Sequence, residues 1–147
     1  MQKEILLEMI KQNQSTSHFF DGVYEENASL RLNDKAASIG FIYRHIGKTI
    51  NLFYQFFGIA TDVVNTAIGK TDNGQRYDVE YSRQLIEKRY QALKDVIENS
   101  TNDDRLKPVE KPFFGTVTRI RLFAHILFHN SHHAGQISMT LVKGSKL

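Results

Sequence analysis

Apolar side chains recur every three or four residues in four separate stretches of the chain, which is the spacing of amphipathic helices. The clearest series predicts a helix over about residues 35–57, with Asn33 or Asp34 as its N-cap. Its apolar positions are Ile39, Ile42, Ile46, Ile50, Phe53 and Phe57. A first helix is predicted over about residues 2–26, although the polar run at residues 13–17 interrupts its pattern.

The second half of the chain predicts two more helices. A third helix is expected to end before Asn99, and its apolar positions are Ile86, Tyr90, Leu93 and Ile97. The fourth is expected to open at Gly115, to run to about Val142 and to end at Gly144. No segment alternates like a strand, and residues 99–104 are predicted to form an exposed loop.

Two long connections separate these helices. Residues 58–78 contain a turn cluster at residues 71–74 and are long enough for a short helical turn around residues 63 and 64. The second connection carries both prolines of the chain. A length of 147 residues fits one domain, so we predict an all-α, four-helix bundle over residues 1–147.

Composition and charge exclude several classes of protein. Lys and Arg number 19 against 16 Asp and Glu, and the two signs alternate, so we expect no nucleic-acid partner. No apolar run approaches the ~20 residues of a membrane span, and the N-terminus does not read as a signal peptide. We therefore expect a cytoplasmic protein. Because cysteine is absent, any metal must be held by histidine or oxygen ligands.

The fourth helix carries a dense group of histidines. Residues four apart lie on one helix face, so His129 and His133 can both bind one ion, and by spacing alone so can His125 and His129. All three cannot, because His125 and His133 lie ~12 Å apart along the axis. The apolar residues Leu122, Ile126 and Ile137 lie on or beside the face that holds His129 and His133. We therefore predict His129 and His133 as ligands.

His45 lies on the inward stripe of the second helix and is predicted as the third ligand. The alternative is a histidine-rich core that water and backbone groups satisfy. Gln136 is placed to orient a ligand or to contact bound water, or it is simply polar packing. His125 and His132 are expected to face solvent or a subunit partner. A group of phenylalanines is expected to lie in the core, and a few of them could line a pocket over the metal. They are Phe41, Phe53, Phe56, Phe57, Phe113, Phe114, Phe123 and Phe128.

Two segments resemble the motifs of the DinB/YfiT-like superfamily. Residues 129–137 read HNSHHAGQI and residues 38–46 read SIGFIYRHI, in the order and spacing of that family. The resemblance implies an up-up-down-down bundle with long crossover connections, a divalent metal on His45, His129 and His133, and frequently a homodimer. Members often carry Arg where this chain has Ala134.

The predicted site supports two hypotheses of function. Three imidazoles leave an open coordination position, which is typical of catalytic sites, and they suit zinc, nickel or iron. The family resemblance implies a metal-dependent enzyme of the hydrolase type, or a transferase that uses a low-molecular-weight thiol. The alternative is a non-catalytic metal-binding or dimerisation module, perhaps linked to stress, in which a fourth protein ligand closes the site.

Overall fold

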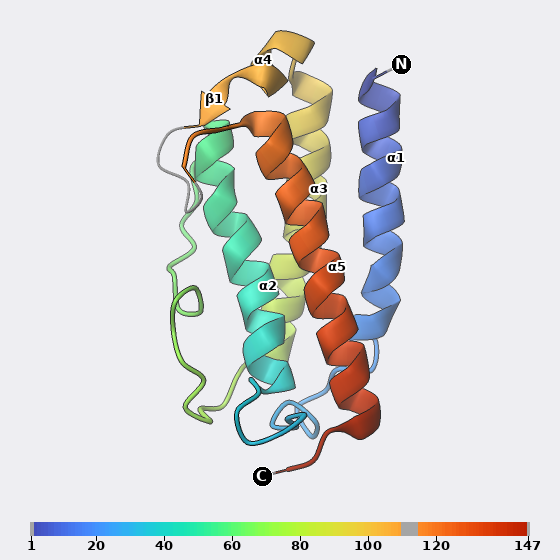
Figure 1. The fold of residues 1–147 in the computed structure, drawn as a ribbon, viewed down its shortest axis with the longest axis vertical. Coiled ribbons are helices and arrows are strands. Elements are labelled where there is room, and N and C mark those ends of the chain that lie inside the picture. Colours follow the sequence, from blue (N-terminus) through green and yellow to red (C-terminus); the bar gives the residue numbers. More distant parts are fainter. Residues whose placement is uncertain (1, 110–114, 147) are drawn as a thin grey trace.

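The computed structural model describes residues 2–109 and 115–146, and four long helices form its bundle (Figure 1). They are α1 (Gln2–Ser15), α2 (Ile39–Phe53), α3 (Val79–Asn99) and α5 (Arg119–Lys143). The shorter elements are the 3-10 helices η1 (Thr16–Phe20) and η2 (Tyr54–Phe57), the helix α4 (Asn102–Leu106) and the strands β1 (Pro108–Val109) and β2 (Val117–Thr118). The predicted helical bundle is confirmed. No helix among the described residues has the length and apolar character to cross a membrane.

The helices α1 and α5 run in one direction and α2 and α3 in the other (Figure 1). Lys3, at the start of α1, donates to the carbonyl of Glu98 at the end of α3 at 2.6 Å. Arg31, before α2, pairs through its backbone with Ser145, after α5. The order is therefore up-down-down-up and differs from the expected up-up-down-down order. Of the connections that the structure describes in full, residues 58–78 cross the length of the bundle, whereas residues 16–38 stay at one end (Figure 1).

The first helix is shorter than predicted. It ends at Ser15, within the polar run, where Ser15 Oγ donates to the carbonyl of Gln12 and Thr16 Oγ1 to that of Asn13, both at 2.6 Å. Such side chains compete with the helical backbone pattern. The chain continues as η1 and then as turns, so the prediction of a helix to residue 26 is wrong.

The second helix begins later than predicted. Its N-cap is Ser38, whose Oγ accepts from the backbone N–H of Phe41 at 3.2 Å. Asn33 instead caps a separate turn, because its Oδ1 accepts from the N–H groups of Lys35 and Ala36. The helix continues through η2 and stops at Gly58, which has a φ of +80°. The predicted end near residue 57 therefore holds.

The connection between α3 and α5 is more ordered than expected. Thr101 and Asp104 form a capping box, so residues 99–104 are no simple loop but include the start of α4. Beyond it, β1 and β2 pair antiparallel with Val109 opposite Val117, which corrects the expectation of no strand. The helix α5 opens only at Arg119, and it ends before Gly144 as predicted.

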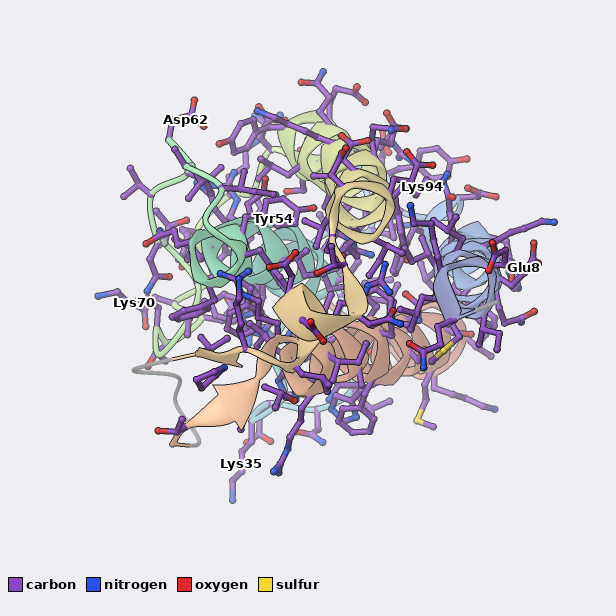
Figure 2. All side chains as sticks on the ribbon, turned by 90° about the horizontal axis from the view of Figure 1, so that it is seen from above. Glu8, Lys35, Tyr54, Asp62, Lys70 and Lys94 are labelled. Carbon is purple, nitrogen blue, oxygen red and sulfur yellow. The ribbon has the colours of Figure 1, made fainter. Side chains whose placement is uncertain are left out.

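The crossover segment, residues 58–78, lies along the outer side of α2, where Figure 2 labels Asp62 and Lys70. It has no helical turn around residues 63 and 64, although its length would allow one. Asp72 attaches this segment to the chain just before α2. Its carboxylate accepts from the N–H of Ser38 at 2.7 Å and pairs with Arg31 at 2.9 Å. Ala67 and Tyr77 are buried against the bundle. The segment therefore covers one side of α2.

The core lies between the four long helices. Its completely buried members include Ile10, Ile39, Ile46, Ile50, Leu93, Leu122, Ile126 and Ile137. Of the predicted aromatic group, Phe41, Phe53 and Phe123 are buried, whereas Phe128 is 66% exposed and corrects that prediction. Phe113 and Phe114 lie outside the described residues.

Candidate metal centre

Three histidines from two helices meet between α2 and α5. The Nε2 atoms of His45 and His129 lie 3.0 Å apart. The ring centroid of His133 lies 4.8 Å from that of His45 and 4.4 Å from that of His129. One nitrogen of each ring lies within 4.8 Å of the other two. The structure therefore brings together the three residues that the sequence singled out.

The helices place these rings for local reasons. Continuous helix through α5 sets His129 and His133 one turn apart on a single face. The helix α2 packs closely on α3 at Gly47, where a Cβ would lie 2.9 Å from the Cβ of Leu85. Because this side of α2 is in close contact with α3, the opposite side, which carries His45, faces α5.

Neighbouring side chains hold two of the rings. Nδ1 of His133 lies 2.6 Å from Gln136 Oε1, and since that oxygen can only accept, the ring donates through Nδ1–H and keeps a lone pair on Nε2. Thr49 Oγ1 lies 3.4 Å from Nδ1 of His45, and Phe41 stacks parallel to the same ring at 6.4 Å. Sequence reasoning placed Phe41 only in a general aromatic group and gave Thr49 no role. Both lie four residues from His45, which is the signal that could have identified them.

Burial keeps the three imidazoles neutral. Burial, and after it the neighbouring His133, lower the pKa of His45 to about 4. For His129, burial and then the charges of His133 and His45 lower the pKa to about 2. Burial also lowers the pKa of His133, although the hydrogen bond with Gln136 acts in the opposite direction and raises it. Neutral imidazole is the form that binds metal, so all three rings are competent ligands at neutral pH.

The donor set fits a divalent ion. Two nitrogens in a tetrahedral site with bonds of ~2.1 Å lie about 3.4 Å apart, and the Nε2 atoms of His45 and His129 are already at 3.0 Å. Within residues 2–109 and 115–146, the cluster of metal-binding side chains contains His45, His129 and His133 and no fourth member. A metal held by three protein ligands keeps a position for a small molecule.

A cleft of about 620 Å³ opens onto the site. Its polar lining is His45, Lys70, His132, His133, Gln136 and Thr140. Its apolar lining is Leu32, Ala36, Ala37, Phe41, Ile42, Ala67 and Met139. No Asp or Glu is among the described residues that line it. The cleft therefore fits a small molecule with an apolar part, and Ala67 brings the crossover segment over one side.

The two other histidines of α5 behave differently from each other. His132 is exposed, as predicted. His125 is partly buried, with its ring 6.0 Å from that of Phe53 and 6.3 Å from that of Phe128, and burial lowers its pKa. His125 is therefore only partly exposed, because its ring lies against Phe53 at the end of α2.

Comparison with known proteins assigns the family. A family model described as the DinB superfamily matches residues 9–137, which is most of the chain. The chain belongs to the DinB superfamily. The fold of this DinB-superfamily chain is similar to that of YfiT from Bacillus subtilis, with a TM-score of 0.73 and 12% identity over 95% of this chain and 85% of that one. YfiT is described as a probable metal-dependent hydrolase with an unusual four-helix bundle topology. No curated protein sequence matches the chain.

The lowered histidine pKa values predict that acid destabilises the metal-free protein. Between the ordinary value of 6.5 and the folded value of about 4 for His45, the unfolded chain binds more protons, so stability falls as pH falls through this window. The melting temperature of chelator-treated protein should be lower at about pH 5 than at about pH 7.5. His129→Leu should reduce that difference, and the exposed His132→Ala should leave it unchanged. Equal melting temperatures of the unaltered chain at both pH values would contradict this account.

Proposed function

We propose that the chain binds one divalent metal ion through His45, His129 and His133 and acts as a metal-dependent hydrolase of a small molecule. The observation that carries the proposal is the meeting of three neutral imidazoles, two of which, His45 and His133, line a 620 Å³ cleft, with no fourth ligand among the described residues. The description of YfiT supports the same class of reaction.

The residues around the site have separable tasks. A divalent ion with an open position supplies Lewis acidity and makes a water molecule more acidic. Gln136 fixes the tautomer of His133, while Thr49 and Phe41 restrict the ring of His45. The apolar cleft walls bind the uncharged part of a substrate and limit the access of bulk water. Imidazole ligands suit zinc, nickel and iron, so the proposal extends to any of these ions.

The activity test compares metal-loaded and metal-free protein on a panel of small esters and amides. Hydrolysis by the loaded protein should disappear on chelation and in His45→Ala, and it should persist in His18→Ala, which removes an exposed histidine outside the cluster. If the reaction is accelerated only when a low-molecular-weight thiol is added, the result would favour thiol transfer as the function instead of hydrolysis. A loaded protein that behaves like the chelated one on the whole panel would count against catalysis.

Gln136→Ala should weaken metal binding by about 10- to 100-fold, because it removes the acceptor that holds the His133 ring. Competition with a chromophoric chelator measures the dissociation constant. Gln136→Glu keeps an acceptor oxygen at the same position, so it should restore most of the affinity. If both variants bind metal as tightly as the unaltered chain, the contact has no part in the site.

We further propose that the chain forms a homodimer through the outward face of α5. Phe128, Met139 and Val142 lie on that face and are 66%, 57% and 75% exposed. Apolar side chains gathered on one face favour association. Light scattering should give about twice the 16.9 kDa of one chain, and Phe128→Lys should lower that mass. A mass near 16.9 kDa for the unaltered chain at micromolar concentration would contradict the dimer.

A further inference from the structure

Arg89 on α3 is a completely buried cation. Its side chain is 0% exposed, and none of its three guanidinium nitrogens has a hydrogen-bond partner in the described part of the chain. The guanidinium carbon lies 4.4 Å from the centroid of the Tyr90 ring. The ring face attracts the cation, but a guanidinium buried without hydrogen-bond acceptors is still strongly unfavourable.

The nearby tyrosines do not supply the missing negative charge. Burial raises the pKa of Tyr43 to about 12 and raises that of Tyr54 as well, so both phenols are neutral at neutral pH. Tyr54 donates its hydroxyl proton to the backbone carbonyl of Arg89 and therefore contacts the backbone of that residue. Arginine itself keeps its proton in proteins. The core thus contains a full positive charge.

Two further unpartnered polar atoms belong to residues close to Arg89. Nδ1 of His129 and Oδ1 of Asn130 are buried and have no hydrogen-bond partner among the described residues. The charge of Arg89 is one of the groups that lower the pKa of His129. Asn130 donates to Oδ1 of Asn13, which also accepts from the hydroxyl of Tyr90. These contacts connect the unsatisfied atoms of α5 to the turn of α3 that carries Arg89.

The unsatisfied groups are mostly donors. A guanidinium has five N–H donors, and His129 adds one in the tautomer that leaves Nε2 free for a metal. The only unpartnered acceptor among these atoms is Oδ1 of Asn130. Buried water could accept from these donors, but it would leave the positive charge of Arg89 uncompensated. An anion both accepts hydrogen bonds and neutralises the charge.

We propose that a small inorganic anion of halide size binds against the guanidinium of Arg89, in the core behind the three histidines. It accepts from Arg89 and, in the tautomer named above, from Nδ1 of His129. The site lies outside the metal-binding cleft and does not depend on the metal. When a divalent ion is bound as well, the anion offsets the charge of Arg89 that would otherwise repel it.

The first test measures the melting temperature of the metal-free protein in sodium bromide and in sodium gluconate at equal ionic strength. Bromide should raise it by a few degrees, with a saturating dependence on concentration, because it binds only the folded state. Arg89→Met should lose the bromide response. Lys88→Met removes the same charge at an exposed position of the same helix and should keep it. No bromide response in the unaltered chain, or an equal response in Arg89→Met, would overturn the proposal.

The second test needs no variant, which matters if Arg89→Met fails to fold. Crystals of the metal-free protein grown in bromide should show an anomalous scattering peak within hydrogen-bond distance of the Arg89 guanidinium. Water molecules or a protein carbonyl at that place, with bromide absent or confined to the surface, would refute the site. Because neither test uses a metal, failure here is distinguishable from failure of the proposed function.

Discussion

Alanine at His129 or His133 should abolish metal binding, whereas His125→Ala and His132→Ala should keep about one divalent ion per chain. The first two rings converge with His45 within 4.8 Å. His132 is exposed, and His125 packs towards Phe53. Elemental analysis of the four variants after gel filtration measures the metal content of each.

The four variants also test the choice of pair on α5. His125 and His129 have the same spacing as His129 and His133, so the sequence alone allows either pair. Loss of metal in His125→Ala together with retention in His133→Ala would show that the other pair binds. Retention of metal in all four variants would show that the ion binds elsewhere.

Asn13→Leu should lower the free energy of unfolding by about 3 kcal/mol, because it leaves several buried groups without partners. The amide of Asn13 donates to the carbonyl of Leu127 at 2.8 Å and to Ser131 Oγ at 2.9 Å. Its Oδ1 accepts from Asn130 at 2.9 Å and from the hydroxyl of Tyr90 at 3.1 Å. One side chain thus connects α1 with α3 and α5. Urea denaturation measures the loss.

The neighbouring Gln14 provides the control for this prediction. It is exposed and makes no contact of this kind among the described residues, so Gln14→Leu should change the free energy of unfolding by less than about 0.5 kcal/mol. If Asn13→Leu is as stable as Gln14→Leu, the buried amide does not hold the bundle together.

The helical bundle could be predicted because four long apolar series require one core, whereas several helix ends could not. Asn33 and Ser38 are equally good N-cap residues by type. The structure starts α2 at Ser38 because the chain before the helix is held by distant backbone contacts, from Gly40 N to Ala28 O and from Ile39 N to Leu30 O. No local pattern reports such contacts.

The three histidines could be found from spacing, but their surroundings could not. Helical periodicity places His129 and His133 on one face wherever the helix begins. The crossover segment has no periodicity, so nothing in the sequence places Ala67 against the cleft. Periodicity likewise cannot separate a core position from an exposed apolar one, which explains the incorrect prediction for Phe128.

The most direct test of the central claim is the visible absorption spectrum of the cobalt-substituted protein during titration with small ligands. The account predicts that azide or a low-molecular-weight thiol changes the spectrum of the unaltered chain, because three histidines leave a coordination position open. The His45→Ala variant should lose the spectrum of the bound ion. A cobalt spectrum that no small ligand changes would contradict the account, since it would show a closed site and favour a non-catalytic metal-binding module.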